Sequence, residues 1–209
     1  RASHRDEVVA AQVRAFAEWL QATASQGRMA RTSNRDEIVR DLAIAFSDSS
    51  PETRRRMMSL IVTRYGEFAV PEIVPYLSSG NADFTTSATF LLDLIGPQAV
   101  MPLIEVMNSP RLLDRMYVAS VLGGLGDQRA VPVLVEHLQR QETEPEVRQR
   151  ILAALTGLRA GAQALLGSLG TEGDLPPAKQ LHYALALKYY HQAPELISGR
   201  MDSFVLWRW

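Results

Sequence analysis

The side chains best suited to acid–base or metal chemistry are four histidines, His4, His137, His182 and His191. They are scattered along the chain, whereas a metal site built from a short motif needs ligands at close, regular spacing. The sequence contains no cysteine, which excludes disulfides, thiolate metal sites and cysteine nucleophiles. Near His182, Tyr183 and Lys179 form either a polar pocket against the C-terminal tail or a solvated helix surface. We therefore predict no catalytic residue, no metal and no cofactor.

Two other groups of residues are suited to binding a protein. Arg54, Arg55 and Arg56 are consecutive. Because neighbouring residues of a helix point about 100° apart, at least one of them must face solvent or a partner. Trp207 and Trp209 stand in the last residues of the chain, and both Trp and Arg are enriched in binding hot spots. The aromatic tail either folds back over the last repeat or docks into a larger assembly.

The charge of the chain argues against nucleic acid as a partner. The formal net charge is −1, and residues 1–65 carry 11 basic and 8 acidic side chains. From Glu67 to Glu105 every Asp, Glu, Lys or Arg is acidic, which predicts an acidic band beside the arginine cluster. A nucleic-acid-binding domain needs a basic excess, because neutralised phosphates supply most of its affinity. We therefore expect protein partners and no nucleic acid.

The hydropathy of the sequence predicts a soluble chain. No apolar run reaches the roughly 18 to 20 residues of a membrane-spanning helix. The sequence begins at Arg1 without an initiator methionine, which leaves an upstream signal peptide or membrane anchor open. We expect a cytoplasmic location, with a periplasmic or membrane-tethered one as the alternatives.

The elements that would position these residues repeat along the chain. Gly66, Gly96 and Gly126 are thirty residues apart, and each is followed by an Ala-Val segment with a proline, at residues 69–74, 99–104 and 130–135. A fixed period of this size is typical of a solenoid, whose units bury a core by stacking on one another. Such a fold presents one long surface, which suits binding better than catalysis.

Caps and prolines predict the helix boundaries. Ser33 and Ser50 mark helix starts, and each repeat glycine provides a left-handed helix end. The predicted helical pairs are 33–46 with 50–66, 68–78 with 82–95, 98–107 with 110–125, 128–141 with 145–158, and 160–169 with 177–191. We predict a single domain with a capping helix within 1–32, repeats over 33–191 and a tail over 192–209. Its core includes Val70, Ile73, Leu103, Val131, Leu134, Ile151 and Leu155.

The segment 126–138 is the most specific part of the sequence. It reads Gly-Asp-Gln-Arg-Ala-Val-Pro-Val-Leu-Val-Glu-His-Leu and is followed by Pro-Glu-Val-Arg at 145–148 and Ala-Ala-Leu at 153–155. It closely resembles the HEAT-like repeats of the phycobilisome-lyase type, over roughly residues 50–165. The resemblance implies a right-handed all-α superhelix, with the Ala-Val-Pro helices on its convex face and the Pro-Glu-Val-Arg helices on its concave face. The family includes bilin-attachment proteins, regulators and adaptors, so the fold does not select a function.

Two other HEAT-like enzyme classes fit the sequence poorly. Deoxyhypusine hydroxylases hold two irons with His-Glu dipeptides, whereas this chain has only the reversed pair Glu136-His137. Alkylpurine DNA glycosylases need a basic concave groove, which the acidic stretch argues against. We expect a non-enzymatic adaptor or accessory subunit that binds a protein partner through the concave groove and its charged flank. A bilin lyase or bilin-binding chaperone is the alternative.

The repeat register predicts a column of residues in this groove. Residues one period apart stack, so Arg54 should align with Phe84, Asp114 and Arg148. The column either contacts a partner or is structural, with its arginines paired to Asp48, Glu142 or Glu144 in the preceding turns. Together with the arginine cluster and the tail, the candidate partner-binding residues are Arg54, Arg55, Arg56, Phe84, Asp114, Arg148, Trp207 and Trp209.

Overall fold

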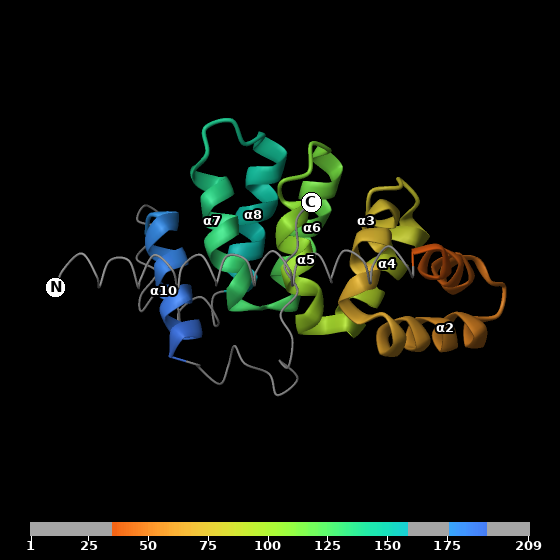
Figure 1. The fold of residues 1–209 in the computed structure, drawn as a ribbon. Helices are drawn as coiled ribbons and strands as arrows, with labels where there is room; N and C mark the ends of the chain where they lie inside the picture. Colours follow the sequence, from red (N-terminus) through yellow and green to blue (C-terminus); the bar gives the residue numbers. More distant parts are fainter. Residues whose placement is uncertain (1–34, 159–175, 192–209) are drawn as a thin grey trace.

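The computed structural model describes residues 35–158 and 176–191, and within these ranges it contains helices and turns but no strand. Residues 35–47 are helical and pair with α2. After them α3 pairs with α4, α5 with α6, and α7 with α8, and the pairs stand side by side in a row (Figure 1). The labelled helices are α2 (Pro51–Arg64), α3 (Val70–Leu77), α4 (Ala82–Ile95), α5 (Val100–Val106), α6 (Leu112–Leu125), α7 (Val131–Gln139), α8 (Pro145–Gly157) and α10 (Ala178–Tyr190).

These helices confirm the all-α class and the predicted pairs within the described ranges. The bounds of α4 match the prediction at both ends, and those of α2, α6 and α8 differ from it by one or two residues. The predicted capping helix in 1–32, the helix at 160–169 and the tail over 192–209 lie outside the described residues.

Local sequence determines where two of the second helices begin. Ser50 Oγ accepts a hydrogen bond from the backbone N–H of Thr53 at 3.4 Å, and Pro51 follows in the first turn of α2. Asn81 Oδ1 accepts from two backbone N–H groups of α4, at 2.9 and 3.3 Å. These side chains satisfy N–H groups that have no partner inside the helix, which favours a start at these positions.

The first helices α3, α5 and α7 each follow a short 3-10 turn that the sequence prediction missed. The turns η1 (Gly66–Ala69), η2 (Gly96–Ala99) and η3 (Gln128–Ala130) lead into α3, α5 and α7. The three repeat glycines have positive φ angles, as predicted. Gly126 takes the left-handed helical conformation, whereas Gly96 has φ 65° and ψ −136°. A side chain would be strained at either angle pair, so glycine is required at this junction.

The core lies between the two layers of helices. All seven predicted core residues are buried, and the most exposed of them, Leu155, has only 8% of its surface accessible. Burying one such side chain contributes about 1.5 to 3 kcal/mol to folding. The helix α3 is buried along most of its length, because it packs against α4 of its own pair and against α5 and α6 of the next pair.

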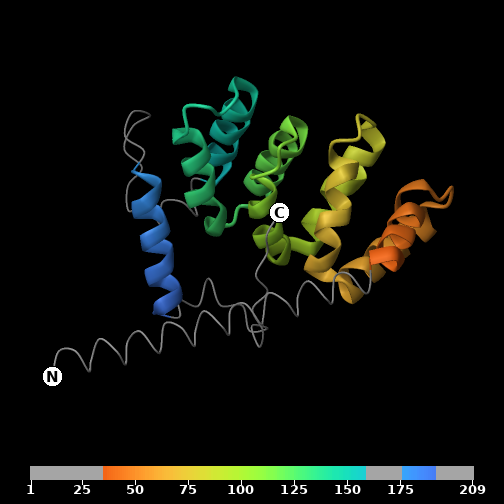
Figure 2. The same cartoon turned by 45° about the horizontal axis from the view of Figure 1, so that its top comes forward.

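The second helices are unevenly spaced along the row. α6 and α8 are in close contact through the small residues Gly123, Ala154 and Gly157. α2 and α4 contact one another less closely, and Figure 2 shows the helical pairs fanning out. Side-chain size at the contact thus decides how near two neighbouring second helices lie.

The helix α10 confirms a helix within the predicted range 177–191. It packs against α7, and its predicted partner helix at 160–169 lies outside the described residues. Gln139 accepts from the Ala178 N–H at 3.0 Å, and Lys188 Nζ donates to Gln128 Oε1 at 2.9 Å. The end of α7 meets the start of α10, and the turn before α7 meets the end of α10. The two helices are therefore antiparallel. Polar groups at both ends of α7 therefore position α10.

One helical stretch, Ala82–Val106, has the length and composition of a membrane span, with 25 residues and a mean hydropathy of 1.4. It is not one straight helix, because α4 ends and η2 intervenes at Gly96 before α5 begins. α4 has 14 residues, fewer than the roughly 20 needed to cross a bilayer. Half of the apolar window is buried inside the protein, as in a core helix.

Candidate functional site

Capping residues define the register of the second helices. The N-caps of α2, α4, α6 and α8 are Ser50, Asn81, Arg111 and Glu144. The fourth residue after each cap donates its backbone N–H to the cap carbonyl, and these equivalent residues are Arg54, Thr85, Arg115 and Arg148. The predicted column is therefore wrong at Phe84 and Asp114, which each precede the aligned position by one residue. The repeat glycines are evenly spaced, but the loops between helices differ in length.

The arginines of the corrected column bind the turn before their own helix. Arg54 and Arg115 each donate from Nη1 to a carbonyl six residues earlier, at 2.7 Å. Arg148 donates to two carbonyls at the end of α7, at 2.7 and 3.1 Å. Arg115 also forms an ion pair with Glu144 of the next pair. Carbonyls at helix ends lack partners inside the helix, so these contacts support a structural ladder at Arg54 and Arg148.

Asp114 is buried, whereas Phe84 is only partly buried. The Asp114 carboxylate is 2% exposed and accepts hydrogen bonds from the hydroxyls of Ser78 at 2.6 Å and Ser109 at 3.0 Å. Phe84 is half-buried and packs edge-on against Tyr76, with 5.6 Å between the ring centroids. Asp114 joins the end of α3 to α6, and Phe84 fills an aromatic cluster. The burial of Asp114 favours a structural role, and a role of Phe84 in partner binding stays a prediction.

Arg55 and Arg56 are the exposed members of the arginine cluster. Neither forms a hydrogen bond or an ion pair with a described residue. Arg55 lines a groove between α2 and α4, whereas Arg56 does not. The expectation that at least one of these arginines faces solvent is confirmed. Trp207 and Trp209 lie outside the described residues, so their role stays a prediction.

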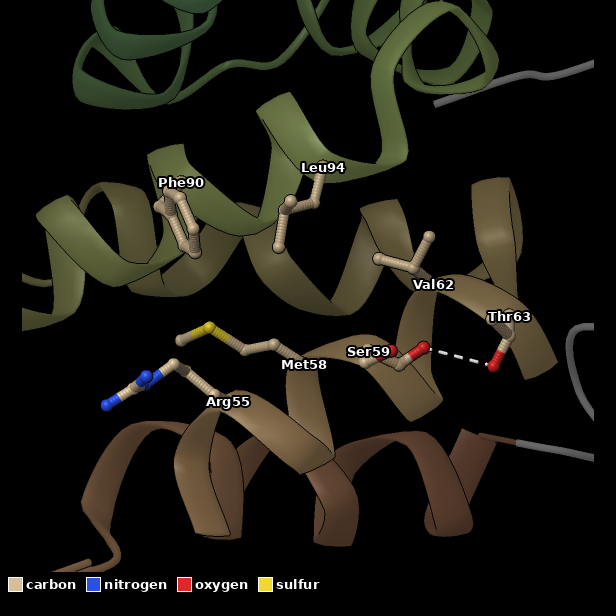
Figure 3. A pocket seen from close by; sticks show the side chains of 7 residues that line it. All are labelled: Arg55, Met58, Ser59, Val62, Thr63, Phe90 and Leu94. Atoms are coloured by element: carbon tan, nitrogen blue, oxygen red, sulfur yellow. Dashed lines mark hydrogen bonds between the residues drawn. The ribbon is translucent and has the colours of Figure 1, made fainter. Parts of the chain in front are cut away.

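The groove between α2 and α4 has a volume of about 200 Å³ and a mainly apolar lining. α2 contributes Met58 and Val62, and α4 contributes Phe90 and Leu94, which point toward α2 (Figure 3). Phe90 is 50% exposed and Leu94 is 46% exposed. Arg55 stands at the end nearer the N-terminus of α2. The site therefore combines two accessible apolar side chains with one adjacent guanidinium.

Sequence reasoning missed Phe90 and Leu94, although a signal was available. They are the ninth and thirteenth residues after the N-cap of α4. The same two positions in the other second helices hold the small or polar residues Ser59, Thr63, Ser120, Gly124, Ala153 and Gly157. Of these four helices, only α4 places large apolar side chains there. Aligning the repeats by their caps would have revealed the difference.

The acid-only stretch does not form one exposed band. Glu72 is 9% exposed and forms an ion pair with Arg35 at 3.2 Å. Glu105 is half-buried, whereas Asp83 and Asp93 are exposed on α4. Burial of Glu72 corrects the predicted band. Asp83 and Asp93 remain exposed, and neither lines the groove.

His137 and His182 lie in different surroundings, the first buried and the second exposed. His182 Nε2 lies 3.1 Å from Glu136 Oε2 and joins α10 to α7. Burial opposes ionisation of Glu136, but Arg140 and His182 outweigh it and lower the pKa of that carboxyl. Burial lowers the pKa of His137 to about 4, so the ring is neutral near pH 7. No group of three potential metal ligands occurs in residues 35–158 and 176–191.

Residues 114–140 match the model of the PBS lyase HEAT-like repeat family. The match covers most of α6 and all of η3 and α7, and it includes the segment 126–138 that carries the resemblance. No curated protein matches the chain. The chain therefore contains a PBS lyase HEAT-like repeat at residues 114–140.

Proposed function

We propose that the protein is a non-enzymatic interaction module, an adaptor or accessory subunit that binds a protein partner. The observation that carries the proposal is the half exposure of Phe90 and Leu94 beside the α2–α4 groove. Apolar side chains grouped on one exposed face mark interaction sites. A buried aromatic or aliphatic anchor is also the usual source of binding energy in such sites.

We further propose that the row of helices is a right-handed α-solenoid of about five pairs. The common cap register of α2, α4, α6 and α8 supports this architecture, because equivalent residues recur in these four helices. In such a solenoid these helices line the concave face. The groove would then lie on the surface that solenoids use for extended contacts.

The size of the groove favours the adaptor over the bilin alternative. Pockets for small molecules and cofactors commonly measure about 300 to 1,000 Å³, whereas the groove measures about 200 Å³. Mixing the protein with biliverdin tests this directly, and we expect an unchanged visible spectrum. A shifted spectrum would support a bilin-binding function and contradict the proposal.

Comparative affinity capture tests the adaptor function itself. The full chain and its Phe90→Ala/Leu94→Ala variant are immobilised and exposed to lysate of the source cells, and bound proteins are quantified by mass spectrometry. We expect at least one protein that the variant loses. Leu152→Ala is the matched control, because Leu152 is 49% exposed on α8 and lies outside the groove. Equal capture by all three baits would overturn the proposal.

A further inference from the structure

We infer that the segment of the partner docking between α2 and α4 is apolar and acidic. In this arrangement an apolar side chain of the partner lies against Phe90 and Leu94, and a carboxylate beside it binds Arg55. The inference rests on the proposed interaction function and specifies the chemistry of the partner.

Charge is the first argument. The residues lining the groove include one cation, Arg55, and no carboxylate. The other arginines of α2 do not line the groove. Arg54 binds a backbone carbonyl, and Arg64 pairs with Glu37 at 2.6 Å. Arg55 forms no hydrogen bond or ion pair with a described residue. A guanidinium beside an apolar surface is suited to a carboxylate, which it binds through two parallel hydrogen bonds.

Volume is the second argument. An engineered cavity of about 150 Å³ in another protein holds benzene, so a groove of about 200 Å³ accommodates one aromatic or branched apolar side chain. Phe90 and Leu94 provide the wall, and Met58 and Val62 provide the opposite side. The site therefore fits one apolar side chain of the partner with a charged side chain next to it.

The polarity of the groove also orients the bound segment. At the end opposite Arg55, the Thr63 hydroxyl donates to the carbonyls of Ser59 and Leu60, at 3.0 and 3.1 Å. That end is therefore neutral, with its donor already used. The carboxylate is expected at the end nearer the N-terminus of α2, and the apolar anchor follows along the groove.

Selection from a phage-displayed library of random 12-residue peptides tests the inference. The bait is the immobilised full chain, and phage that also bind the Phe90→Ala/Leu94→Ala variant are removed. We expect the selected peptides to combine an aromatic or aliphatic residue with Asp or Glu. A selected peptide is then synthesised, labelled and titrated by fluorescence anisotropy.

Two charge reversals in α2 provide a matched comparison. Arg55→Glu should weaken binding of the peptide about tenfold or more, whereas Arg56→Glu should change it less than about threefold. Both side chains are exposed, so helicity by circular dichroism should be the same in both variants. Replacing the acidic residue of the peptide by Lys should restore binding to the Arg55→Glu variant. Rescue by the swapped pair would show direct contact.

The outcomes separate the inference from the proposed function. Selected peptides that need Phe90 and Leu94 but lack acids, or that ignore Arg55→Glu, would overturn the inference and leave the interaction function standing. Failure to select any peptide that depends on Phe90 and Leu94 would count against both. A dimer of this chain in light scattering that Phe90→Ala/Leu94→Ala dissociates would show a second copy in the groove, and it would overturn the peptide inference.

Discussion

Gly123 of α6 lies directly against Ala154 of α8. A methyl group at Gly123 would stand 2.6 Å from the Ala154 Cα and 2.8 Å from its Cβ, nearer than real Cβ atoms approach. Gly157 lies on the other side of the same contact, near the Gly123 carbonyl. The absence of a side chain at Gly123 thus lets the two second helices approach closely.

Gly123→Ala should lower the free energy of unfolding by about 1 to 3 kcal/mol, because the added methyl forces backbone apart in a packed contact. Urea denaturation followed by circular dichroism measures this change. Gly124→Ala is the matched control, since nothing lies within 4 Å of a Cβ there. In that variant the free energy of unfolding should rise by about 0.5 to 1 kcal/mol, because Ala has a higher helix propensity than Gly. Equal effects of the two substitutions would contradict the close approach.

Asp114→Ala should cost about 2 kcal/mol of stability. The hydroxyls of Ser78 and Ser109 lose their shared acceptor in a buried site, and unpaired buried polar groups are costly. The double variant Asp114→Ala/Ser78→Ala should be more stable than additivity predicts, because one of the stranded donors is gone. Asp93→Ala, at an exposed carboxylate, should change stability by about 0.5 kcal/mol or less.

Arg148→Met should destabilise the protein by about 1 to 3 kcal/mol. The variant keeps an apolar stem but loses both donors to the carbonyls at the end of α7. Arg150→Met is the control, because Arg150 is exposed and makes no hydrogen bond with a described residue. Thermal unfolding of the two variants compares them directly. A stable Arg148→Met variant would indicate that Arg148 is available to a partner.

Stability should fall on acidification from about pH 6.5 to pH 4 because of His137. Its pKa is lowered by burial to about 4 in the folded protein, against about 6.5 in the unfolded chain. The unfolded state therefore takes up the proton at a higher pH than the folded state. The free energy of unfolding falls by about 3 kcal/mol across this window. The stabilising effect of neutral His137 is fully present above pH 6.5.

Urea titrations at several pH values measure this dependence. His137→Leu should remove that part of the slope, and it leaves no unpaired nitrogen where His137 Nε2 has no partner among the described residues. His182→Gln keeps the buried ring of His137, and it should therefore keep that part of the slope. A slope unchanged in His137→Leu would show that carboxylates alone cause the acid sensitivity.

The sequence by itself determined the helical pairs and the core. Apolar periodicity, caps such as Ser50 and the repeat glycines are local signals, and they placed Val70, Leu103 and Val131 correctly in the interior. Each of these features depends on residues a few positions apart. They can therefore be interpreted without knowing which helix lies beside which.

Only the tertiary structure decided the register and the candidate site. The loops between helices differ in length, so Asp114 turns into the core where the glycine period predicted an open groove. The spacing of the second helices depends on contacts between repeats, such as Gly123 against Ala154. For the same reason Phe90 and Leu94 face an open groove beside α2. Distances between elements far apart in sequence arise from packing, which a periodic pattern does not encode.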